Sequence, residues 1–128
     1  MNETRRKLLV RGLSSLCVVG IVVGVCGWGL YLPLSLRVSF AEDQTRIFDD
    51  MRSQALAGDA TEAARCLQYI VGYYPSGTKQ TPASRLDRIV ERSRAHATAD
   101  IIAHLRARTG SDLGPNAEPW IRRYATQP

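Results

Sequence analysis

The chain contains 128 residues, 23% of them charged, and carries a formal net charge of +5 at pH 7. The charge is unevenly placed: residues 1–12 hold four basic side chains and one acidic, whereas residues 37–128 hold 13 basic and 11 acidic. A remainder so nearly balanced argues against a dedicated nucleic-acid surface. The three cysteines, Cys17, Cys26 and Cys66, form neither a disulfide framework nor a CxxC metal pair.

The most distinctive segment comprises residues 13–36, which contain no charged residue and no histidine. Twelve of these 24 residues are Leu, Ile or Val, each favourable by about 0.3–0.6 kcal/mol near the centre of a bilayer. As an α-helix the segment would be about 36 Å long, enough to cross a hydrocarbon core of about 30 Å. The segment is therefore predicted to be a transmembrane helix.

The charges beside this helix predict its topology. The basic tail, residues 1–12, favours a cytoplasmic N-terminus, which places residues 37–128 outside the cytoplasm, attached to the cytoplasmic (inner) membrane. The alternative is a cleaved signal peptide, because Ser39-Phe40-Ala41 offers small residues for cleavage after Ala41. The apolar region is longer than the 7–15 residues typical of signal peptides, so an uncleaved, single-pass signal-anchor is predicted.

Small residues within the predicted span lie at a spacing that allows close helix contact. Gly20, Gly24 and Gly27 continue a stripe that starts at Cys17, and such a stripe lets two helix backbones approach. This face is the predicted contact for a homodimer or for the membrane helix of another protein. Trp28 and Tyr31 are the predicted interfacial anchors, because amphipathic rings favour the headgroup region, and Pro33 is predicted to kink or end the helix.

Four helices are predicted after the membrane segment, at residues 40–57, 60–74, 82–109 and 117–125. The first three follow patterns typical of helix N-termini, namely Ser39 with Glu42, Asp59 with Glu62, and Thr81 before Pro82. Gly58 and Gly110 are predicted to end helices, and residues 75–78 to form a turn. No segment alternates polar and apolar residues long enough to predict a strand. The expected fold class is therefore all-α, with one transmembrane helix and a small helical-hairpin domain.

Apolar residues at helical spacing predict which faces of these helices are buried. On the first two helices they are Ile47, Phe48, Met51, Leu56, Ala63, Leu67, Ile70 and Tyr74. On the last two they are Leu86, Ile89, Val90, Ser93, Ala97, Ile101, Ile102, Leu105, Trp120, Ile121 and Tyr124. Cys66 falls within this apolar pattern and is interpreted as a small buried hydrophobe, with an intermolecular disulfide as the alternative.

One cluster of titratable residues stands out. His96, Asp100 and His104 follow one another at four-residue spacing, and an i, i+4 pair can ligate a metal on a helix. The outer two would lie about 12 Å apart along the axis, so the three cannot hold one ion. We interpret them as a polar edge beside the apolar stripe. No catalytic, cofactor-binding or metal residue is assigned, no cofactor is expected, and the chain is not expected to be an enzyme.

Two further groups of residues admit a structural and a functional interpretation. The arginines of the third predicted helix form a charged solvent face or, functionally, a contact for anionic headgroups or an acidic partner; they are Arg85, Arg88, Arg92, Arg94, Arg106 and Arg108. Glu91 is expected to pair with arginines on this helix. Tyr69, Tyr73 and Tyr74 are expected to close the core beneath a turn, with an aromatic recognition surface as the alternative.

The segment LRARTGSDLGPNAEPWIRRY, residues 105–124, resembles the closing segment of bacterial HEAT-repeat-like proteins. In these a helix ends in Thr-Gly, an Asp-(Leu/Phe)-Gly loop follows, and Pro-Glu precedes a helix with Trp. The matching residues are Thr109, Gly110, Asp112, Leu113, Gly114 and Trp120, although the order here is Glu118-Pro119. Residues 58–75 are similar to the second helix of tetratricopeptide-like or HEAT-like hairpins, and the layout resembles small single-span membrane proteins of planctomycete-type bacteria. These resemblances imply helical hairpins and no activity.

Together these observations predict a membrane-anchored helical interaction or scaffold protein. Its expected partners are the lipid bilayer and a protein, or a second copy, bound through the membrane helix; nucleic acid is not expected. One alternative is an accessory subunit of a larger membrane complex. Another is a membrane-tethered, metal-dependent hydrolase that uses His96 and Asp100.

Overall fold

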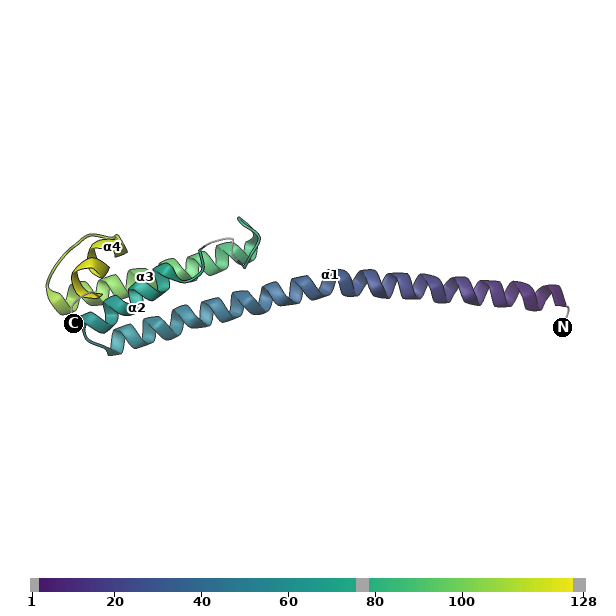
Figure 1. The fold of residues 1–128 in the computed structure, drawn as a ribbon, viewed down its shortest axis with the longest axis horizontal. Helices are drawn as coiled ribbons and strands as arrows, with labels where there is room; N and C mark the ends of the chain where they lie inside the picture. Colours follow the sequence, from purple (N-terminus) through teal and green to yellow (C-terminus); the bar gives the residue numbers. More distant parts are fainter. Residues whose placement is uncertain (1–2, 76–78, 126–128) are drawn as a thin grey trace. The chain divides into compact units, whose positions relative to one another are not determined.

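The computed structural model describes residues 3–75 and 79–125, and its contacts divide the chain into two units, Met1–Leu36 and Arg37–Pro128. We call these the N-terminal and C-terminal units and describe each by itself. The side chains of residues 1–11 are not described, so the charged groups of the predicted tail lie outside the described part of the chain, as do residues 76–78 of the predicted turn. Within the described ranges the chain is helical and contains no strand, which confirms the all-α class (Figure 1).

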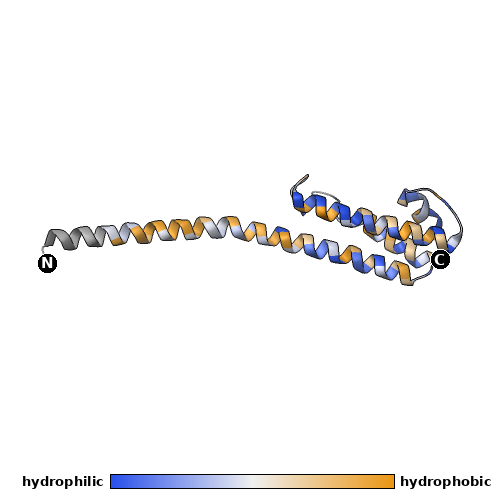
Figure 2. Ribbon diagram, turned by 180° about the vertical axis from the view of Figure 1, so that it is seen from behind, coloured by the Kyte–Doolittle hydropathy of each residue, from blue (hydrophilic) through white to orange (hydrophobic). Residues whose placement is uncertain are grey.

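The N-terminal unit is the first part of helix α1, which spans Glu3–Ala57. Its apolar side chains are exposed throughout residues 13–36, and Figure 2 shows the concentration of hydrophobic residues there. The most apolar 18-residue window of this helix has a mean hydropathy of 2.1, and none of the window is buried. By length and composition this is one helix able to cross a membrane, and a signal sequence would have the same properties.

Helix α1 does not end where the sequence predicted. It continues through Pro33 and past Ser39 to Ala57, so the helix does not end at Pro33, and the prediction of a new helix capped by Ser39 and Glu42 was wrong. A capping box stabilises N–H groups that lack an intrahelical partner, and here the preceding turn is already helical. The proline removes one hydrogen bond, but it is flanked by Leu32 and Leu34, which favour helix.

The C-terminal unit is built from the second part of α1 together with α2 (Ala60–Gly72) and α3 (Arg85–Thr109). α2 is antiparallel to α1, because the Gln54 amide donates to Glu62 near the start of α2 at 2.5 Å, whereas the ring of Phe48 contacts that of Tyr73 just after its end. α3 runs parallel to α1, because Gln80, just before α3, contacts Arg37 and Asp100 contacts Arg52. The three form an up-down-up arrangement.

The helix caps are partly those predicted. The Asp59 carboxylate accepts from the Glu62 N–H at 2.8 Å, and Gly110 ends α3 in the left-handed region at φ +66°, as expected. The Thr81–Pro82 cap was wrong: α3 starts three residues later, where the Ser84 hydroxyl accepts from the Asp87 N–H at 3.1 Å. The Ser84 N–H donates to the Thr81 carbonyl instead, which makes this segment a turn.

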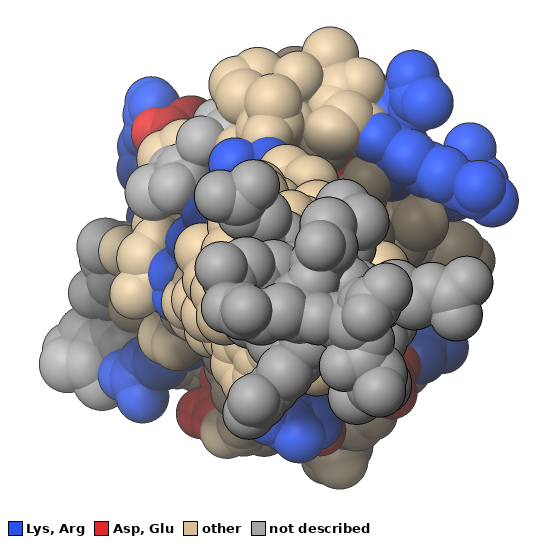
Figure 3. All heavy atoms as spheres, turned by 90° about the vertical axis from the view of Figure 1, so that its right-hand side faces the viewer, with Lys and Arg blue, Asp and Glu red and all other residues tan. Residues whose placement is uncertain are grey.

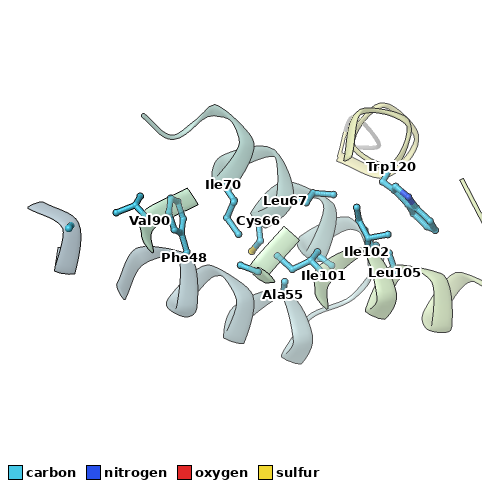
Figure 4. Close-up of a cluster of buried hydrophobic side chains, with 13 residues drawn as sticks. Phe48, Ala55, Cys66, Leu67, Ile70, Val90, Ile101, Ile102, Leu105 and Trp120 are labelled. Atoms are coloured by element: carbon cyan, nitrogen blue, oxygen red, sulfur yellow. The ribbon is translucent and has the colours of Figure 1, made fainter. Parts of the chain in front are cut away.

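The core joins all three long helices, and Figure 4 shows its side chains converging. Fully buried large side chains come from each of them and from the short closing helix: Phe48, Leu67, Ile70, Ile101, Leu105 and Trp120. This confirms most of the predicted stripe. Three predicted members, Leu56, Tyr74 and Ile89, are instead 40%, 39% and 49% exposed. Tyr73 rather than Tyr74 packs against the core, because α2 ends at Gly72 and the next residues leave the helical register.

The chain closes with α4 (Ala117–Trp120) and a single π-helical turn, η1 (Ile121–Ala125), where one helix was predicted. The indole N–H of Trp120 donates to the Gly114 carbonyl at 2.9 Å, so this buried ring has its polar atom satisfied. Gly114 has φ +85°, a conformation that a side chain would strain. Its N–H donates to Asp112 Oδ1 at 3.0 Å, which shapes the loop preceding α4.

Candidate functional site

The predicted membrane contact face is open in the single chain. A methyl group added at Gly20, Gly24 or Gly27 would meet nothing within 4 Å. The predicted anchors Trp28 and Tyr31 are 66% and 68% exposed. The N-terminal unit therefore has an exposed apolar surface with a row of glycines along it. The second helix that would pack on this row remains a prediction.

His96 and Asp100 lie together with Arg52 of α1. The Asp100 carboxylate accepts from Arg52 Nε at 2.6 Å and lies 3.4 Å from His96 Nδ1. Arg52 also contacts Asp49 at 3.1 Å. Hydrogen bonding to Asp100 is the first cause that raises the pKa of Arg52, and the guanidinium is the counter-ion of this carboxylate. The cluster ties α1 to α3.

His104 belongs to a different part of α3. Its Nε2 is buried and has no hydrogen-bond partner among the described residues. Within residues 3–75 and 79–125, no three His, Cys, Asp or Glu side chains gather closely enough to hold a metal ion. The structure thus brings together His96 and Asp100 of the predicted constellation and gives Asp100 a cationic neighbour.

An open groove of about 410 Å³ lies between α1 and α3 next to this cluster. It is lined by residues of both helices: Asp49, Arg52, Ile89, Arg92, Ser93, His96 and Ala97. A smaller hollow of about 290 Å³ adjoins it along α3, where Arg85 and Arg88 join Ile89 and Arg92. The lining of this smaller hollow is mostly cationic, with the exposed side chain of Ile89 among its three arginines.

Aromatic and basic residues meet at the end of the C-terminal unit where the chain enters it. Lys79 Nζ lies 3.9 Å from the ring centroid of Tyr74 and 5.0 Å from that of Phe40. Both distances are within the range of cation–π attraction. Arg37, the first residue of the unit, donates from Nη1 to Thr81 Oγ1 at 2.9 Å. Nothing in the local sequence pattern indicated this cluster, because its members come from three separate segments.

The three tyrosines divide between the core and the surface. The ring of Tyr73 packs against Phe48, Tyr69 and Tyr74 at centroid distances of 6.0, 5.3 and 4.5 Å. Burial is the first cause that raises the pKa of Tyr73. Tyr69 and Tyr74 are 48% and 39% exposed, so the structural interpretation holds for Tyr73, and the other two face solvent.

The arginines of α3 differ sharply in their partners. Arg94 donates to the carbonyls of Tyr73 and Tyr74 and lies 3.7 Å from Glu91, so it holds the end of α2 against α3. Arg106 pairs with Asp112 at 3.0 Å. Arg85, Arg88 and Arg92 make no ion pair with any described residue, and the same holds for Arg108. In Figure 3, Lys and Arg side chains project from the surface, and one group stands largely apart from acidic ones.

Cys66 is buried within the core, 4% exposed, and has no disulfide partner. Burial, followed by the charge of Glu62, raises the pKa of its thiol. A thiol that is buried and kept protonated is a poor nucleophile. The structure therefore supports the interpretation of Cys66 as a packing residue.

These features define a class: a small all-α protein in which an exposed apolar helix leads into a three-helix bundle with a short closing helix. The chain matches no known family model, no curated protein and no solved structure. The resemblance of residues 105–124 to HEAT-like closing segments, and that of the layout to single-span bacterial proteins, remain predictions.

Proposed function

We propose that the chain is a single-pass membrane protein that holds a helical interaction module at the membrane surface. The observation behind this proposal is the contrast within α1: the large apolar side chains of residues 13–36 are exposed, whereas the continuation of the same helix packs into a core. Exposed apolar surface of this extent needs a cover, and a bilayer supplies one. The uncharged length matches a hydrocarbon core.

The position of Ala41 supports retention of the N-terminal segment. Ala41 is 4% exposed and belongs to the core cluster of the C-terminal unit. Cleavage after Ala41 would cut the helix that provides this residue and would remove Arg37 from Thr81. A signal-anchor that stays attached keeps these contacts.

The proposed topology has the N-terminus in the cytoplasm and the C-terminal unit outside it, at the cytoplasmic membrane. Protease added to intact spheroplasts tests this arrangement. We expect loss of an epitope placed after the last residue and protection of one placed before the first. If the epitope after the last residue is protected from protease until the cells are lysed, the C-terminal unit lies in the cytoplasm and the proposed topology is wrong.

The module is proposed to act by binding a partner protein, or a second copy, as a scaffold or as an accessory subunit. Photo-crosslinking residues at Gly20 and Gly24 sample the open face, and one at Val22 samples a different side of the helix. We expect a crosslinked product only from the two glycine positions. Its mass identifies it as a dimer or as a complex with another protein. Equal products at all three positions, or none, would remove the basis for this contact.

A further inference from the structure

A surface with the character of an interfacial site surrounds the point where the chain enters the C-terminal unit. We call it the entry surface, and it consists of Arg37, Phe40, Tyr74 and Lys79, together with Arg85 and Arg88 at the start of α3. We propose that the entry surface binds the anionic phospholipid headgroups of the bilayer that holds residues 13–36. This inference rests on the proposed membrane anchor and adds a second, reversible membrane contact made by the bundle itself.

The entry surface is held together by contacts between distant segments. Arg37 donates to Thr81 at 2.9 Å, and the Gln80 amide donates to the Arg37 carbonyl at 3.1 Å. These bonds fix the segment preceding α3 beside the first turn of the unit. Because Arg37 directly follows Leu36 in the chain, this segment remains close to wherever the apolar helix leaves the bilayer.

The charge of the entry surface is largely unneutralised. Arg85 and Arg88 form no ion pair with a described residue, and the carboxylate of Asp87 between them in the chain is buried and accepts from the Ala83 N–H. The acidic residues nearest in sequence to Arg37 are Glu42 and Asp43, and Asp43 pairs with Arg46 at 2.7 Å. A cluster of unpaired cations attracts an anionic surface, and each cation near such a membrane strengthens binding by roughly fivefold.

Exposed apolar groups lie among these cations. Phe40 and Tyr74 are each 39% exposed and flank Lys79, and Ile89 is 49% exposed between the arginines. Aromatic rings favour the headgroup region, and the long stems of Lys and Arg lie along apolar surface while their charges reach polar groups. Cations with aromatic rings are thus suited to a lipid interface rather than to bulk water.

The anchor identifies the partner as lipid rather than an acidic protein. A tether a few residues long gives an effective concentration in the millimolar range, so even a weak contact with headgroups would be occupied. An acidic protein would have to compete with this permanently adjacent surface.

The test uses the full chain reconstituted in vesicles, with its three cysteines replaced by alanine. A spin label is placed at Ala83, beside the entry surface, or at Ala107, near the opposite end of α3; both side chains are exposed. We expect the collision rate with a water-soluble nickel complex to fall severalfold at Ala83 when phosphatidylglycerol replaces a third of a neutral phosphatidylcholine bilayer, with no change at Ala107. Equal rates at Ala83 in both bilayers would overturn the proposal, and are the result expected if the surface binds an acidic protein.

Charge variants sharpen the test. The double variant Arg85→Gln with Arg88→Gln should abolish the difference in collision rate at Ala83 between the two bilayers. The matched control, Arg65→Gln with Arg108→Gln, changes two exposed arginines outside the entry surface and should retain the difference. About 1 M salt should also abolish it, because screening then extends over only about 3 Å. A difference that survives the Arg85 and Arg88 change contradicts the assignment.

Alkaline carbonate treatment of the same vesicles distinguishes failure of the membrane anchor from failure of the entry surface. Release of the chain refutes the anchor. Retention of the chain, with equal collision rates at Ala83 in both bilayers, refutes only the entry surface.

Discussion

The two units differ in the exposure of their apolar side chains. In residues 13–36 the leucines, valines and isoleucine are exposed, and none of these side chains is buried among the described residues. In the C-terminal unit, side chains of the same kind, such as Leu67 and Ile101, are fully buried by one another. The stability of the second unit is therefore intrinsic, whereas the first depends on its surroundings. One helix, α1, belongs to both regimes.

The largest difference should appear when one apolar side chain is truncated in each unit. Phe48→Ala removes a ring with no exposed surface, and we expect a loss of about 3–5 kcal/mol in the unfolding free energy. Leu30→Ala, at a residue 76% exposed, should change it by less than about 0.5 kcal/mol. Urea unfolding in micelles, followed by Trp120 fluorescence in a Trp28→Phe background, measures both. Similar losses would contradict the comparison.

A charge introduced into the N-terminal unit should affect membrane insertion and leave the C-terminal unit unchanged. Val22→Arg places a cation near the middle of the apolar segment, at a cost of about 2.5–3.5 kcal/mol for membrane insertion. Flotation of newly synthesised chains with membrane vesicles should show a much smaller inserted fraction. Urea unfolding of the C-terminal unit should not change, and destabilisation of the bundle would show that the units are coupled.

A smaller effect separates the observed helix caps from the predicted ones. Ser84→Ala removes an acceptor for the Asp87 N–H and should cost about 1 kcal/mol. Ser39→Ala should leave stability within about 0.5 kcal/mol, because Ser39 lies inside α1. Chemical denaturation of the two variants side by side provides the measurement. A loss at Ser39 as large as that at Ser84 would indicate that a helix starts there.

The smallest effect depends on pH. The Gly114 N–H, followed by the Arg106 guanidinium, lowers the pKa of Asp112. The folded state thus favours the carboxylate, whose contribution to stability is present above the unfolded pKa of about 3.9 and is lost as the pH falls through the folded value. The exposure of the pair makes this contribution slight. Denaturation between about pH 6 and pH 3 should show a shallower acid loss for Asp112→Asn than for the original chain, and identical profiles would exclude the contribution.

Local patterns predicted the helices of the bundle because each depends on neighbouring residues. The cap at Asp59, the end of α3 at Gly110 and most of the buried stripe follow from spacing within single helices. The continuity of α1 could not be predicted in this way, since Pro33 and Ser39 are genuine helix-end signals that the surrounding leucines override.

The candidate site was less predictable because its contacts join distant segments. Lys79 meets Phe40 across 39 positions of sequence, and Asp100 meets Arg52 across 48. Helical spacing predicted that His96 lies beside Asp100, but it could not predict that Arg52 of another helix forms an ion pair with the Asp100 carboxylate. Only the packing of α1 against α3 reveals this.

Alkaline carbonate extraction of membranes that contain the intact chain tests the central claim most directly. A chain whose residues 13–36 cross the bilayer should remain in the membrane pellet at full length, with Ala41 still joined to the residues before it. Recovery of the chain in the supernatant, or of a fragment that begins at Glu42, would contradict the account.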